Sequence, residues 1–226
     1  MDFYSCFDSD PQDIDLFCIA IGRPDRSRKQ QHIGIYYTSA TGDTKFLHQP
    51  FHYHALESDP EDKYLWLDVP LDADNKMHMA TFCAMVAEEN PKGIAYSICH
   101  KGTSFTKTGK FHTESQFAGL TCATFVMQIF ESQVLPIIDV KNWKHIPSDK
   151  DWQNQILQVL VKYGGVEKDS DYYLFQKKRL ADGVARFKPE AVAAAAVSPD
   201  APHSPSDILD CSNEILEAAI AHSNKV

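Results

Sequence analysis

Residues 116–131 read Gln-Phe-Ala-Gly-Leu-Thr-Cys-Ala-Thr-Phe-Val-Met-Gln-Ile-Phe-Glu. Small residues up to Gly119 lead into an apolar run with helical spacing, which predicts a loop followed by a helix that carries Cys122 in its first turn. The free N–H groups and the positive dipole end of a helix start stabilise a thiolate. The segment therefore favours a nucleophilic Cys122 with a pKa below the ordinary value of about 8.5.

A base for this nucleophile is expected in a second segment. Gln31-His-Ile-Gly-Ile-Tyr-Tyr37 has the pattern of a strand, and a turn at 38–43 separates it from a further strand that ends at His48. Pairing of these two strands in a hairpin would bring His48 beside His32. His32 could then take the thiol proton while His48 fixes its tautomer from the far ring nitrogen.

The same chemistry requires donors for the oxyanion that forms when a thiol attacks a carbonyl. The backbone N–H of Cys122 at the helix start is the first candidate. The side-chain amide of Gln116 is the second, because it donates a hydrogen bond without adding a charge.

These segments resemble the NlpC/P60 enzymes. His32-Ile-Gly-Ile-Tyr-Tyr, followed by Phe46-Leu-His48, resembles their histidine strand and the polar residue after it, and 120–126 resembles their cysteine helix. Here the histidine precedes the cysteine, which is the order of the circularly permuted members of the papain-like superfamily. The spacing of Gln116 and Cys122 is similar to that of the oxyanion glutamine and nucleophile of papain.

The resemblance implies an α+β protein of permuted papain-like (NlpC/P60-type) fold, in which an antiparallel sheet packs against the cysteine helix. We expect a catalytic core over 1–135 and a helical extension over 136–188 that packs on it. Residues 189–205, with an alanine run and four prolines, read as a linker. An amphipathic helix is expected over 206–226.

Periodicity and turn residues predict the individual elements. The expected strands cover 14–22, 32–37, 45–48, 64–69 and 94–99, with a charged turn at 23–29, and the expected helices cover 76–90, 151–163, about 169–187 and the segment that begins at Cys122.

Composition limits the function classes. The chain has 226 residues and a net charge of −9, which argues against broad electrostatic binding of nucleic acid or anionic membranes. No secretory leader and no membrane span are readable. Six cysteines without C-x-x-C pairs indicate reduced thiols. We expect a cytoplasmic protein, and delivery by a specialised secretion system would be compatible with the same sequence.

The resulting hypothesis is a cysteine hydrolase that cleaves an amide bond, in a peptide or isopeptide, through a thioester. A cell-wall peptidase and an effector toxin both fit. One alternative is an acyltransferase of the lecithin:retinol acyltransferase-like type, which acts on acyl groups. The other is a non-catalytic binding module, in which Cys122 is a core residue and the C-terminal helix docks a protein partner.

No cofactor or metal is expected. The histidines at 48, 52 and 54 could suggest zinc, but no further ligand has the required spacing.

Overall fold

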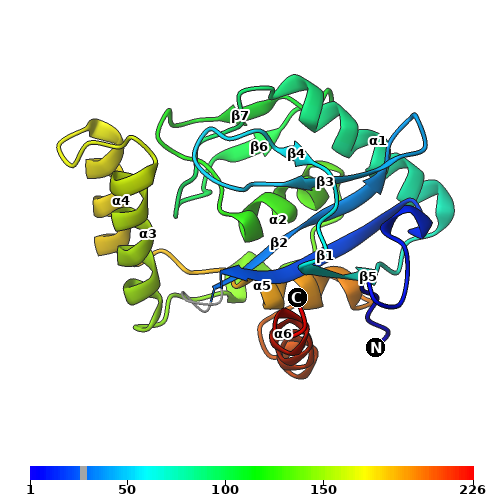
Figure 1. Cartoon of the computed structure of the whole chain (residues 1–226). Coiled ribbons are helices and arrows are strands. Elements are labelled where there is room, and N and C mark those ends of the chain that lie inside the picture. Colours follow the sequence, from blue (N-terminus) through cyan, green and yellow to red (C-terminus); the bar gives the residue numbers. More distant parts are fainter. Residues whose placement is uncertain (26–29) are drawn as a thin grey trace.

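The computed structural model describes residues 1–25 and 30–226, so part of the predicted turn at 23–29 lies outside the described residues. Within the described residues the chain forms a five-stranded antiparallel sheet of order β4-β3-β2-β1-β5, a two-stranded sheet of β6 and β7, and six α-helices (Figure 1). The α+β class is therefore confirmed.

The strands are β1 (Phe17–Asp25), β2 (Gln30–Thr38), β3 (Thr44–His48), β4 (Glu57–Ser58), β5 (Tyr64–Asp68), β6 (Thr103–Phe105) and β7 (Phe111–Thr113). The helices are α1 (Ala73–Glu89), α2 (Cys122–Ser132), α3 (Asp149–Tyr163), α4 (Asp171–Asp182), α5 (Pro189–Val197) and α6 (Leu209–Ser223).

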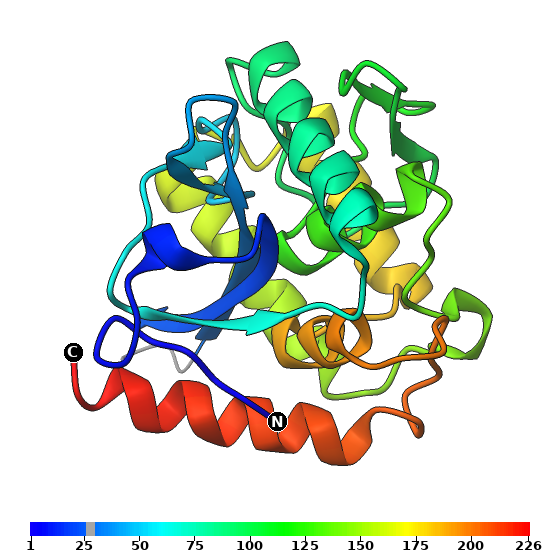
Figure 2. The same ribbon diagram turned by 90° about the vertical axis from the view of Figure 1, so that its right-hand side faces the viewer.

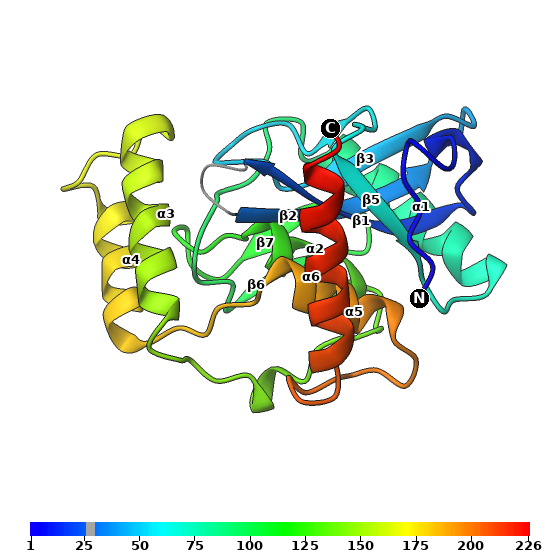
Figure 3. The ribbon, with the colours of Figure 1, turned by 60° about the horizontal axis from the view of Figure 1, so that its bottom comes forward.

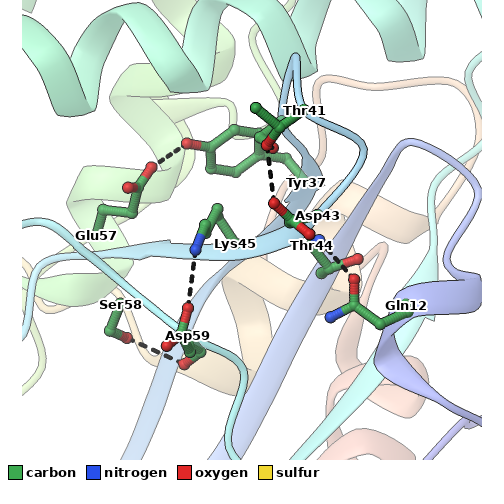
Figure 4. Close-up of polar contacts among 10 residues, drawn as sticks. Gln12, Tyr37, Thr41, Asp43, Thr44, Lys45, Glu57, Ser58 and Asp59 are labelled. Atoms are coloured by element: carbon green, nitrogen blue, oxygen red, sulfur yellow. Dashed lines mark hydrogen bonds and ion pairs between the residues drawn. The ribbon is translucent and has the colours of Figure 1, made fainter.

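The predicted histidine hairpin is formed by β2 and β3. Gly34 lies opposite His48 in the strand pairing, and Tyr36 lies opposite Phe46. Polar contacts fix β3 from both sides (Figure 4): the Thr44 N–H donates to a side-chain oxygen from the N-terminal segment, and Lys45 forms a 2.9 Å ion pair just beyond β4. The register that places His48 is thus specified locally.

The two faces of the main sheet bury different sets of side chains, because successive residues of a strand point to opposite faces. Ile33 and Ile35 of β2 belong to the large core, which also contains Phe125 and Ile129 of α2. Tyr36 belongs to a smaller aromatic cluster on the other face. The body of the cysteine helix therefore packs against the aliphatic face of β2.

The start of α2 is fixed by a capping box. Thr121 is the N-cap, and its hydroxyl accepts from the backbone N–H of Thr124, whose own hydroxyl accepts from the Thr121 N–H. Such reciprocal bonds satisfy two of the N–H groups that a helix start leaves free. Cys122 is the first helical residue, so it lies in the first turn, as the sequence predicted.

The prediction of a strand at 94–99 is wrong. This segment is buried but irregular, and its backbone groups are satisfied by other parts of the chain. The side chain of Gln176, from α4, accepts from the Ile98 N–H, and the Tyr172 hydroxyl donates to the Tyr96 carbonyl. Leu120, just before α2, donates its N–H to the Ala95 carbonyl. The apolar run thus reflects burial without strand pairing.

The predicted linker over 189–205 is also wrong, because its first half is helix α5. Pro189 occupies the first helical turn, where its missing N–H costs nothing. Ala191–Ala196 are all buried against the sheet and the other core helices. Alanine side chains allow helices to pack closely. Because they are only weakly hydrophobic, the sequence pattern did not indicate that this segment is buried. The core accordingly extends well beyond residue 135.

Replacing Ala194 with leucine should destabilise the protein by about 1–3 kcal/mol, because the enlarged side chain has no space in a fully packed position. Denaturant unfolding measures the change. Ala221→Leu, at an exposed position of α6, is the matched control and should stay within about 0.5 kcal/mol of wild type. Equal stability of the two variants would contradict the placement of α5 in the core.

The remaining helices cover two sides of the molecule. Helices α3 and α4 lie together at one end of the sheet and pack on Tyr96 and Ile98 (Figures 1 and 3). Helix α6 runs past the N-terminus (Figure 2) and packs its buried Ile215 and Ala219 into the chain's own core region. Among the described residues, none of the helices combines the length and apolarity that crossing a bilayer requires.

Candidate active site

Two of the predicted site residues are in direct contact. His32 Nε2 lies 2.9 Å from His48 Nδ1. The Phe46 ring stacks on His48 with 4.1 Å between ring centroids, and Tyr64 packs edge-on against His32. The hairpin therefore holds the two imidazoles in one fixed arrangement within an aromatic cluster. His32 uses its Nε2 for this contact, which makes Nδ1 the nitrogen that could serve a nucleophile.

Gly34 makes this approach possible. A Cβ atom at this position would lie 2.7 Å from His48 Cβ and 2.7 Å from the Leu47 carbonyl oxygen. Both distances are too short for any side chain, so the close pairing of β2 and β3 beside the histidines requires glycine.

We expect Gly34→Ala to separate the two histidines and to destabilise the fold by about 1–3 kcal/mol, because β3 must move away. Denaturant unfolding and the histidine NMR signals would report the two effects. Gly42→Asn is the control, because nothing lies within 4 Å of a Cβ added there and asparagine tolerates its positive φ. An unchanged His32–His48 contact in Gly34→Ala would be inconsistent with this role of glycine.

Both imidazoles are neutral near pH 7. Burial lowers the pKa of His32 well below its ordinary value, with smaller contributions from His48 and Lys63. Burial also lowers the pKa of His48 to about 4, again helped by the positive charge of Lys63. A neutral ring keeps one bare nitrogen that can accept a hydrogen bond, although the lowered pKa makes it a weaker base than an exposed histidine.

Cys122 lies next to the histidine strand, at the residue that follows His32. The backbone of Ile33, of Ala123 and of Cys122 itself lowers the pKa of the thiol, which places the sulfur between β2 and the start of α2. The side chain is buried, with 3% of its surface exposed. In the described part of the chain, no hydrogen bond joins the sulfur to the His32 ring, which lies among Phe46 and Tyr64. The His32 ring thus lies on the aromatic face of β2, whereas Cys122 belongs to the core on the aliphatic face. The structure brings the cysteine helix to the strand but does not bring the thiol and the imidazole into contact.

The expected low pKa of Cys122 is wrong. Burial raises the pKa of the thiol to about 11, and the three backbone groups and the positive charge of Arg186 only partly offset it. Removing the thiol from water penalises the charged form more than the helix start favours it. At neutral pH this site therefore holds a thiol and a neutral imidazole, where the sequence had suggested a thiolate and an imidazolium.

Tyr96 is a site residue that the sequence analysis missed. Its side chain is 4% exposed, and both the thiol and the backbone of Cys122 influence the pKa of its hydroxyl, which places Tyr96 near Cys122. Its own backbone N–H donates to His52 Nδ1 at 3.1 Å, which helps to fix the irregular segment. Tyr96 is therefore a buried polar side chain close to the residue whose N–H was predicted to bind an oxyanion. Nothing in the sequence separates this tyrosine from the other aromatic residues.

Arg186 is the second residue that the sequence did not indicate. Its guanidinium lies 4.3 Å from the ring centroid of Trp152. Its Nε is buried and has no hydrogen-bond partner among the described residues. The arginine also lines a groove of about 330 Å³ between the α3 region and helices α5 and α6. Its positive charge lowers the pKa of the Cys122 thiol.

Gln116 is exposed and lies in the turn before α2. In the described residues its side chain forms no hydrogen bond with Cys122 or with the two histidines. The structure therefore does not bring this predicted oxyanion donor to the other three residues.

The search for metal ligands covered residues 1–25 and 30–226 and found no group of three or more histidine, cysteine or acidic side chains that could hold an ion. All six cysteines are free thiols. No family model, curated protein or solved structure matches the chain.

Proposed function

We propose that this protein is a cysteine hydrolase that cleaves an amide bond through a thioester on Cys122. The observation that carries the proposal is the contact between His32 Nε2 and His48 Nδ1. In this proposal His48 orients His32 through that contact, and His32 Nδ1 remains available as the base for the thiol of Cys122. The order of orienting group, base and nucleophile is the one that such catalysis requires.

At neutral pH the proposed mechanism starts from a thiol and a neutral imidazole. As the sulfur attacks the substrate carbonyl, its proton passes to His32 Nδ1. When the tetrahedral intermediate collapses, the carbon–nitrogen bond breaks and the imidazolium returns that proton to the leaving amine. A water molecule then gives a proton to His32, and its oxygen attacks the thioester carbonyl. When the carbon–sulfur bond breaks, the acid product leaves and the imidazolium returns the proton to the sulfur.

The oxyanion would be bound by the backbone N–H of Cys122 together with the Tyr96 hydroxyl. Tyr96 is buried near Cys122, and its hydroxyl has a proton to donate. In this proposal the second oxyanion donor is the buried Tyr96 and not the exposed Gln116.

Tyr96→Phe is therefore expected to lower kcat by about 10²-fold, the loss typical of one oxyanion donor. Gln116→Ala serves as the comparison and should stay within about threefold of wild type. Steady-state kinetics on a substrate identified by product analysis would decide between the two donors. A large loss in the glutamine variant, with full activity in Tyr96→Phe, would reverse the assignment.

The order of segments supports a permuted papain-like fold of the NlpC/P60 type. A hairpin carries the two histidines, and the helix with the nucleophile follows later and packs on the same strand. The substrates proposed for this scaffold are cell-wall peptides and isopeptide conjugates, with acyl lipids as the acyltransferase alternative. We keep a cytoplasmic site of action, reached by synthesis there or by delivery, as part of the proposal.

The test is to incubate wild-type protein and Cys122→Ser with peptidoglycan fragments, ubiquitin-like conjugates and acyl lipids. Mass spectrometry identifies the products. Release of a free acid and an amine by wild type alone would support hydrolysis, and transfer of the acyl group to an added amine would indicate the acyltransferase. Equal turnover by both proteins would exclude Cys122 as the nucleophile.

A further inference from the structure

The His32–His48 contact continues to a third side chain. Ser58 Oγ, on β4, lies 3.4 Å from His48 Nε2. The same oxygen lies 3.3 Å from the Asp59 carbonyl oxygen, to which it donates (Figure 4). Ser58 pairs with Phe46 across β3 and β4, so the strand register fixes its place beside His48. An unbroken chain of polar contacts thus runs from His32 to a backbone carbonyl.

The donor and the acceptor in each hydrogen bond of this chain follow from its last group, the Asp59 carbonyl. A carbonyl oxygen only accepts, so the single hydroxyl proton of Ser58 is directed to Asp59. Ser58 Oγ must then accept from His48 Nε2–H. A neutral imidazole carries one N–H, so His48 Nδ1 is bare and accepts from His32 Nε2–H. By the same count, His32 Nδ1 has no proton.

The opposite direction would disable the base. If Ser58 donated to His48 Nε2, His48 would carry its proton on Nδ1 and donate it to His32 Nε2. His32 would then hold its proton on Nδ1, where the base function requires a lone pair. The bond from Ser58 to the Asp59 carbonyl is what separates the two arrangements.

We propose that Ser58 is a positioning residue that, through the Asp59 carbonyl, sets the tautomers of His48 and His32 and leaves His32 Nδ1 free to accept a proton. The catalytic part of this inference rests on the proposed function, whereas the tautomer assignment does not. Among the described residues, Lys63 and Tyr64 also lie near the pair, and neither forms a hydrogen bond with a ring nitrogen of these histidines.

Nitrogen-15 NMR of histidine-labelled, full-length protein at neutral pH tests the assignment directly. The chain has 10 histidines, and the signals of His32 and His48 are identified by their loss in His32→Gln and His48→Gln. We expect both residues to carry the proton on Nε2. A wild-type His32 with its proton on Nδ1 would overturn the proposal, whatever the protein catalyses.

Variants of Ser58 test the cause. Ser58→Ala should give His48 a mixed tautomer signal and lower kcat/KM by about tenfold, the upper end of the effect of one hydrogen bond. Ser58→Thr keeps the hydroxyl and should restore both readouts. Ser104→Ala, on β6, has no side-chain hydrogen bond to lose and is the control. Unchanged tautomers in Ser58→Ala would refute the positioning role, and a correct tautomer pattern in a protein without activity would refute only the proposed hydrolysis.

Discussion

Replacing Cys122 with serine should abolish hydrolysis, with kcat/KM falling by about 10³-fold or more. Serine has nearly the same size, so the packing of the first turn of α2 is retained. Its hydroxyl is a much weaker acid than a thiol, and a neutral imidazole cannot activate it to the same extent. The loss therefore reports the chemistry of the sulfur and not a change in the core.

Steady-state kinetics on the substrate identified by product analysis measures this effect. Circular dichroism and the unfolding midpoint show whether the variant is folded. Cys211→Ser is the matched control, because this partly buried thiol lies in α6 and belongs to no proposed step. A folded Cys122→Ser that retains wild-type turnover would require a different nucleophile.

His32→Gln has the second largest expected effect, a loss of about 10²- to 10⁴-fold in kcat. Glutamine keeps a polar side chain on β2 but cannot accept and return a proton. His48→Gln should cost less, because the base remains and only its orientation is weakened. His112→Gln, at an exposed position of β7, controls for the loss of a histidine as such. Full activity in His32→Gln would exclude the proposed base.

The pH profile of wild type adds a separate expectation. The pKa of His32 lies below its ordinary value, so the active, neutral ring is present above about pH 6.5. Activity should fall only as the pH drops through that lowered pKa and the ring becomes protonated. The thiol pKa near 11 places no further transition of Cys122 in the neutral range. A bell-shaped profile with a thiol pKa below 7 would contradict the neutral pair.

The parts of the fold that the sequence predicted are those with a local signal. Alternating aliphatic residues in β2 and a glycine turn specified the hairpin, and its register placed His48 beside His32. The capping threonines and the apolar spacing likewise specified the start of α2.

The errors arose where distant residues decide the outcome. The segment 94–99 has the composition of a strand, but its backbone is held by Gln176 and Tyr172 from α4. Helix α5 was read as a linker because close packing of alanines depends on the surfaces that surround them.

The site shows the same division. The two histidines are sixteen positions apart in one hairpin, and a register argument suffices to bring them together. Tyr96, Arg186 and Ser58 reach the site from three other segments, so only the packed structure reveals them. The pKa of Cys122 also depends on the whole fold, since burial outweighs the local effect of the helix start.

The central claim is that Cys122 and His32 act as one nucleophilic unit, and acylation by 4-nitrophenyl acetate tests it without knowledge of the substrate. Peptide mapping after a short reaction at neutral pH locates the acetyl group. We expect it on Cys122 in wild type and in His112→Gln, and we expect its loss in His32→Gln. Acetylation confined to the more accessible Cys6 and Cys211, or labelling of Cys122 at the same rate without His32, would contradict the account.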